Sequence, residues 1–135
     1  NVVFHRGHFV PTEQRAYHSQ KWGYIYNEWR AWEHQRNIEF VADNNVGMFG
    51  RAEADSVRAR KEFYLKRAPE ELYDYENDPF ALHNLAEDPK YRKILWNMRD
   101  KMHNWMEATN DYCGSGYNMY VAQKKREERQ NRIKK

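Results

Sequence analysis

The sequence has little cysteine and no long apolar run, and each shortage excludes a class of protein. Cys113 is the only cysteine among 135 residues, so the chain has no internal disulfide, and no zinc-binding pattern occurs. No apolar stretch approaches the roughly 20 residues that a transmembrane helix requires. A secretory signal peptide and an Asn-x-Ser/Thr sequon are also missing from this stretch, which opens at Asn1 rather than at Met. The sequence therefore does not indicate a cellular compartment.

An excess of one charge sign is also missing over most of the chain. Lys and Arg number 23 against 20 Asp and Glu, which leaves a net charge of +3. Much of the small surplus lies in residues 124–126 and 132–135, a pattern typical of a solvated terminal helix. Because no stretch resembles a nucleic-acid module, we expect neither nucleic acid nor a membrane as a partner.

Aromatic residues, in contrast, are plentiful. They make up 16% of the chain, with ten Tyr and five Trp, whereas the mean hydropathy is low. A chain of this length suits one domain that buries roughly two thirds of its unfolded surface. We therefore expect a thin core built from a few large rings.

A helix is predicted from Pro89 to about Ala108. Asp88 can accept the free amide hydrogens of the first turn, and proline at the first helical position loses no hydrogen bond. Apolar residues recur on one face of this helix. They are Tyr91, Ile94, Leu95, Met98, Met102, Trp105 and Met106. A helix that binds a partner would show the same stripe, but packing within the domain is favoured because a strand precedes it.

Four strands are predicted, at about residues 2–10, 14–20, 22–29 and 71–75. The last alternates apolar and polar side chains and stops at turn-forming residues, as half-buried strands do. The second and third are separated by one short step and suit a β-hairpin. The sequence therefore predicts an α+β fold, with a small antiparallel sheet and the amphipathic helix packed on one face.

The most distinctive polar cluster is His5, Arg6 and His8, which surround Gly7. Two imidazoles and a guanidinium at a glycine turn can bind sulfate or carboxylate through charged hydrogen bonds. Surface His and Arg without such a role are commoner. These three residues are the candidate substrate-binding residues.

The aromatic strand at 22–29 allows two interpretations. Trp22, Tyr24 and Tyr26 share one face, which either packs in the core or lines a sugar-binding cleft, and core packing is favoured. The remaining segments carry weaker signals. Residues 30–50 read as a long loop, 51–68 as a solvated helix, and 111–116 as a flexible exit from the main helix.

The stretch ELYDYENDPFALHNLAEDPKY, followed by an amphipathic helix, resembles the end of the C-terminal domain of the sulfatase family. Within that family it is most similar to the sulfamidase, or heparan N-sulfatase (N-sulfoglucosamine sulfohydrolase), group. The likeness also rests on residues 22–29, 66–71 and 109–111. Residues 1–112 are therefore interpreted as a sulfatase C-terminal domain, and 113–135 as a polar tail that is helical or frayed.

The resemblance implies a formylglycine, made from Cys or Ser in a C/S-x-P-x-R motif, and a calcium ion in the full-length enzyme. Cys113 is followed by Gly114, Ser115 and Gly116 rather than by that pattern. No catalytic and no metal-binding residue is therefore assigned here. The implied partners are an N-terminal catalytic sulfatase domain and a sulfated saccharide, and the implied location is periplasmic, secreted or lysosomal.

The function implied is that of a domain which completes the substrate pocket of a sulfatase acting on sulfate esters or sulfamates of heparan-type sugars. An arylsulfatase or another sugar O-sulfatase is the alternative within the same class. A stand-alone carbohydrate- or protein-binding module, using the aromatic strands and the basic tail, is the alternative from a different class.

Overall fold

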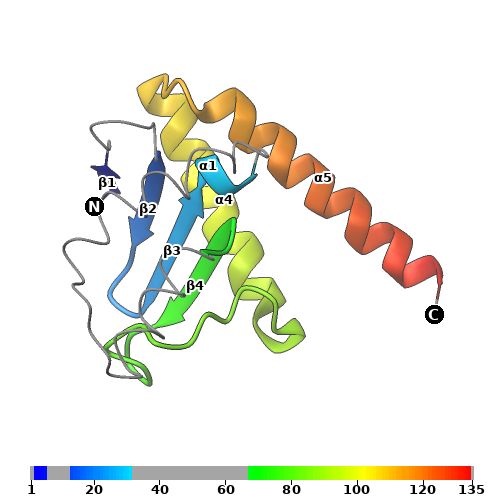
Figure 1. Ribbon diagram of the computed structural model, residues 1–135, viewed down its shortest axis with the longest axis horizontal. Coiled ribbons are helices and arrows are strands. Elements are labelled where there is room, and N and C mark those ends of the chain that lie inside the picture. The colour runs from blue at the N-terminus through cyan, green and yellow to red at the C-terminus, as the bar shows by residue number, and fades with distance from the viewer. Residues whose placement is uncertain (1, 6–12, 32–66, 135) are drawn as a thin grey trace, which may run out of the picture.

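The computed structural model describes residues 2–5, 13–31 and 67–134, which form one antiparallel sheet covered by helices (Figure 1). The sheet has the order β1-β2-β3-β4. Its strands are β1 (Val2–His5), β2 (Gln14–His18), β3 (Trp22–Asn27) and β4 (Glu70–Asp74). The helices are α1 (Glu28–Ala31), the 3₁₀ turn η3 (Pro89–Tyr91), α4 (Arg92–Thr109) and α5 (Gly114–Ile133). The predicted α+β class is confirmed.

The β2–β3 hairpin forms where the sequence predicts it. Ser19 closes its turn, because the Ser19 amide donates to the Trp22 carbonyl at 2.8 Å and the Ser19 hydroxyl oxygen accepts the Trp22 amide at 2.9 Å. Tyr24 of β3 lies opposite both Tyr17 of β2 and Leu72 of β4. Residues directly opposite in a sheet share a face, so these three side chains point to the same side.

The predicted main helix begins and ends close to the expected residues. The Asp88 carboxylate accepts the Lys90 amide at 2.9 Å, and Pro89 opens a single 3₁₀ turn before α4 starts. Asn110 ends the helix in the left-handed conformation, with φ of 51°, and its amide reaches back to the carbonyls of the last turn. Asparagine tolerates this conformation better than most residues.

The helix buries most of the predicted stripe against the sheet. Leu95, Met98, Met102 and Met106 are buried, and Tyr91, Ile94 and Trp105 pack partly buried at the margin. Both central tyrosines of β3 are fully buried in the same core and Trp22 is partly buried. The favoured interpretation of the aromatic strand as core is therefore confirmed.

The flexible exit expected at residues 111–116 is wrong, because α5 begins at Gly114. Its first turns join the core through Tyr117 and Tyr120, and the Tyr26 and Tyr117 rings meet edge to face with centroids 4.8 Å apart. Beyond these turns α5 is polar and extends away from the sheet (Figure 1). Two large rings one turn apart are enough to anchor a helix whose overall composition is polar.

Several sequence-predicted segments lie outside the described residues. They are the end of the first strand at 6–10, most of the loop at 30–50, and most of the helix at 51–68. Among the helices that the structure describes, none is both long and apolar enough to cross a bilayer.

We expect Met102→Ala to destabilise the domain by about 2–5 kcal/mol, because it removes a fully buried side chain and leaves a cavity. Lys93→Ala, on the exposed side of the same helix, is the control and should cost less than about 0.5 kcal/mol. Urea unfolding of both variants measures the difference. Equal losses would show that this face of α4 is not the buried one.

Candidate functional site

The structure places only part of the predicted substrate-binding cluster. His5 is the last residue of β1 and pairs with Gln14 across the sheet. Arg6 and His8 lie outside the described residues. Their role as substrate-binding residues therefore stays a prediction.

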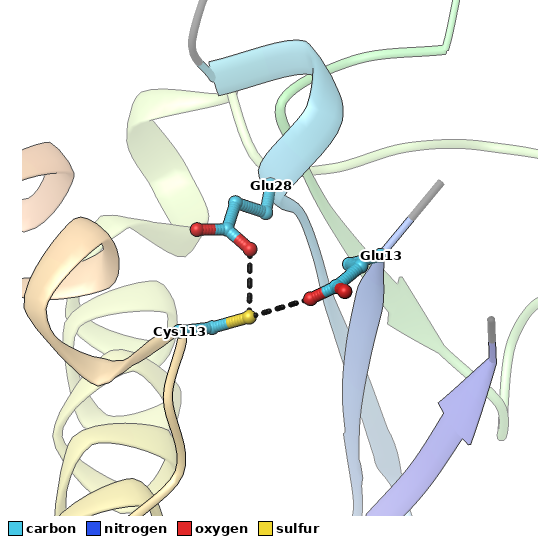
Figure 2. A group of neighbouring side chains, drawn as sticks. All are labelled: Glu13, Glu28 and Cys113. Atoms are coloured by element: carbon cyan, nitrogen blue, oxygen red, sulfur yellow. Dashed lines mark hydrogen bonds between the residues drawn. The ribbon is translucent and has the colours of Figure 1, made fainter. Parts of the chain in front are cut away.

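A different polar cluster lies where the chain enters β2, α1 and α5. We call its members the thiol cluster: Glu13, Arg15, Glu28, Asp111 and Cys113. Figure 2 shows the Glu13 and Glu28 side chains converging on the Cys113 sulfur. The distances from Sγ to the nearest carboxyl oxygens are 2.9 Å for Glu13 and 2.6 Å for Glu28. The Glu28 amide also donates to the Glu13 carbonyl at 3.1 Å, so backbone and side chains bring the same segments together.

Arg15 supplies the positive charge of the thiol cluster. Its guanidinium binds Asp111 at two points, Nε to Oδ2 at 2.8 Å and Nη2 to Oδ1 at 3.0 Å, and Nη2 also lies 3.1 Å from the Cys113 sulfur. Burial opposes ionisation of Asp111, but the hydrogen bonds from Arg15 and from the Cys113 amide outweigh it and lower the Asp111 pKa. Arg15 and Asp111 therefore form a charged pair at the base of α5.

The Cys113 thiol is held in its protonated form. Burial raises its pKa, and so do the hydrogen bonds to the Glu13 and Glu28 carboxyl groups. A buried cysteine in such surroundings is chemically inert. Together with the Gly-Ser-Gly that follows it, this environment does not fit the cysteine from which a formylglycine is made.

The thiol cluster also does not fit a metal ion, although the ligand atoms of Glu13, Glu28 and Cys113 lie within 4.8 Å of one another. The Arg15 guanidinium lies beside the ligand atoms, with Nη2 3.1 Å from the sulfur, so a positive charge is already present there. Calcium prefers oxygen ligands alone, and a metal binds the thiolate, whereas burial and the neighbouring carboxyl groups raise the pKa of the Cys113 thiol. The cluster is therefore interpreted as a set of hydrogen bonds.

A second buried polar group lies between the sheet and the helices. Arg99 of α4 binds Glu70 of β4 at two points, Nε to Oε2 at 3.0 Å and Nη2 to Oε1 at 2.5 Å. The Tyr24 hydroxyl donates to Glu70 at 3.1 Å, and the Tyr117 hydroxyl donates to that of Tyr24 at 3.2 Å. We call Arg99 and Glu70 the core ion pair, and the hydroxyl groups of Tyr24 and Tyr117 extend its hydrogen bonds.

Arg99 is a charged residue on the buried face of α4, since only 2% of it is exposed. Its position carries a signal that could have revealed this: Arg99 lies four residues after Leu95 and three before Met102, which places it on the buried face. Its guanidinium also stacks over the Trp96 ring, with Cζ 4.2 Å from the centroid.

A cavity of about 390 Å³ opens beside the core ion pair. Arg92, Arg99 and Lys124 contribute positive charge to its lining, whereas Glu70, Glu87, Asp88 and Glu128 contribute negative charge. The two signs nearly cancel, so the lining shows no strong preference for an anion or for a cation.

Glu71 forms a third buried network, on a strand that was predicted to be half-exposed. Its carboxylate accepts from Asn27 Nδ2 and Arg67 Nε, both at 2.7 Å, and from the Tyr73 hydroxyl at 2.7 Å. All five residues of β4 are buried, so the half-buried prediction is wrong for this strand. Because these bonds join residues of the protein to one another, the network is interpreted as structural.

The fold and these polar groups define an α+β domain whose buried charges are structural pairs.

No protein-family model matches the chain. Individual relatives do match. One stretch is 50% identical over 42 residues to an ulvan-active sulfatase of Formosa agariphila, covering 31% of this chain and 8% of that relative. Another stretch is 42% identical over 48 residues to human N-sulphoglucosamine sulphohydrolase, covering 36% of this chain and 10% of that relative.

The longest of these matches spans most of the chain. It is 30% identical over 102 residues to the Delta 4,5-hexuronate-2-O-sulfatase of Bacteroides thetaiotaomicron, and it covers 76% of this chain and 19% of that relative. The chain is therefore sulfatase-related, and the matches support its interpretation as a C-terminal fragment. It spans only 8–19% of the length of these relatives.

We expect Arg99→Met to destabilise the domain by about 3–5 kcal/mol, because Glu70 would remain buried without its cation. The double variant with Glu70→Gln should recover part of that loss, since the uncompensated charge is gone. Urea unfolding of wild type, both single variants and the double variant gives the coupling free energy. Additive losses would contradict the pairing.

Proposed function

We propose that the chain is the non-catalytic C-terminal domain of a sulfatase and that it closes one side of the substrate pocket. The observation that carries this proposal is the match of 76% of the chain to a sulfatase, in a sequence without a C/S-x-P-x-R motif. The buried and bonded state of Cys113 supports it, because the only cysteine is unsuited to nucleophilic chemistry.

The proposed substrate is a sulfated saccharide of the heparan type, carrying sulfate esters or sulfamates. Two of the matched relatives bear names that specify a sulfated sugar unit, N-sulphoglucosamine in one and a hexuronate in the other. Transfer of this substrate class to the chain rests on those local similarities.

The chemistry of hydrolysis would come from outside this stretch. The matched relatives are at least five times as long as the region that matches, which leaves ample length for an N-terminal catalytic domain. That domain would supply the formylglycine as nucleophile and a calcium ion to bind the sulfate group. The chain's own contribution would be to recognise the sugar.

A stand-alone sugar-binding module is the less favoured function. It would need the aromatic strand to present its rings to a ligand, whereas Tyr24 and Tyr26 are 0% exposed. A buried ring cannot stack on a sugar. The observation favours the role of a domain within a larger enzyme.

We expect the 135-residue chain alone to show no sulfatase activity, because it lacks the nucleophile motif. Assays with an aryl sulfate and with N-sulfoglucosamine, each with added calcium, test this expectation. Turnover that a chelator abolishes would contradict the proposal. The intact parent enzyme serves as the positive control.

His8→Ala in the intact enzyme should raise KM for the natural saccharide and leave hydrolysis of a small aryl sulfate nearly unchanged, because the aryl sulfate lacks the sugar. Contact between an imidazole and a sulfate or carboxylate should strengthen below about pH 6.5, where an unperturbed histidine becomes charged. Equal losses of activity on the saccharide and on the aryl sulfate would indicate a structural or catalytic role for His8. Unchanged activity on both substrates would contradict contact between His8 and the substrate.

A further inference from the structure

The Cys113 thiol contacts two carboxyl groups but has only one hydrogen to donate. The Cys113 sulfur lies 2.9 Å from one Glu13 oxygen and 2.6 Å from one Glu28 oxygen. A thiol carries one hydrogen and can donate it to one acceptor. The second contact would then bring sulfur lone pairs against a carboxylate, unless that carboxyl group is protonated and donates to sulfur.

The charges around the sulfur lead to the same conclusion. The groups that face it are Glu13 and Arg15 at the start of β2, Glu28 at the start of α1, and Asp111 and the Tyr112 phenol before α5. Arg15 is the one cation among these described groups. It makes its two-point bond with Asp111 and lies 3.8 Å from the nearer Glu13 oxygen.

Ionisation of all three carboxyl groups would therefore set three negative charges against one guanidinium, a net charge of −2. Glu13 is 7% exposed and Cys113 is 1% exposed, so water screens this side of the cluster poorly, whereas Glu28 is only partly buried. Burial and the neighbouring Glu13 charge both oppose ionisation of Glu28 and raise its pKa.

We propose that Glu13, Glu28 and Cys113 form a proton-binding site in which the two carboxyl groups hold one proton between them. One of them donates to the sulfur, and the thiol donates its own hydrogen to the other. The shared proton thereby joins the starts of β2, α1 and α5. This inference rests on the structure alone and does not depend on the proposed function.

The site should make the stability of the domain depend on pH in two opposite ways. Burial raises the pKa of Glu28 in the folded protein. The stability that Glu28 contributes is therefore fully present below its pKa in the unfolded chain, near 4.3, and is lost as pH rises through its pKa in the folded protein. The pKa of Asp111 is lowered instead, so the stability that it contributes is present above its pKa in the unfolded chain, near 3.9, and is lost as pH falls through its pKa in the folded protein. Stability should therefore be greatest in mildly acidic solution.

Glu28→Gln tests the proposal on the 135-residue chain, because the amide stays neutral at every pH and can still donate to sulfur. Urea midpoints between pH 4.5 and pH 8.5 should fall for the wild type and stay nearly level for Glu28→Gln. The wild-type folding equilibrium constant should drop about tenfold for each unit by which the folded pKa exceeds the unfolded one. Glu87→Gln, which replaces an exposed carboxyl group, is the matched control and should keep the wild-type profile.

Carbon-13 NMR titration of the glutamate carboxyl groups provides a second measurement that needs no variant. The Glu28 carboxyl group should titrate above the ordinary glutamate range. Titration of Glu28 within the ordinary range, or the same pH profile in Glu28→Gln as in the wild type, would overturn the proposal. A rise in the urea midpoint on addition of zinc or calcium ions would also overturn it, since the cluster would then hold a cation in place of the proton.

Discussion

The pairing of Arg99 with Glu70 is the interaction on which the rest of the structure depends. A guanidinium on α4 and a carboxylate on β4 are both removed from water, so the helix can lie on the sheet only in the register that brings them together. Tyr24 and Tyr117 extend the hydrogen bonds from this pair to β3 and α5. One ionic contact therefore orients the sheet and both long helices.

The sequence predicted the strands and the main helix because their signals are local. Alternation in a strand, a turn at Ser19, and Asp88 followed by Pro89 each act over a few residues. The burial of Arg99 and Glu71 was missed because a charged residue is normally placed at the surface, and only a partner from another segment makes its burial tolerable. The docking of α5 was missed because Tyr117 and Tyr120 belong to a mostly polar run.

The thiol cluster shows why the candidate site was the least predictable part. Cys113 is 100 residues from Glu13 and 85 from Glu28 in the chain, so no short motif connects them. The sulfatase resemblance rests instead on the segment that runs through β4 into α4, where local sequence and local structure coincide. The matched sulfatases and the α+β fold agree with that resemblance, whereas the roles of Arg6 and His8 stay predictions.

The uneven burial of α5 has a consequence for how its backbone opens. The 20-residue helix is anchored at Tyr117 and Tyr120, and it is tied to α4 once more where Glu128 accepts from the Trp96 indole and pairs with Arg92. Amide hydrogens in the anchored turns can exchange with solvent only when the core opens, whereas those beyond residue 128 exchange through fraying of the helix end. One continuous helix thus contains two ranges of hydrogen-exchange protection, separated at its last contact with α4.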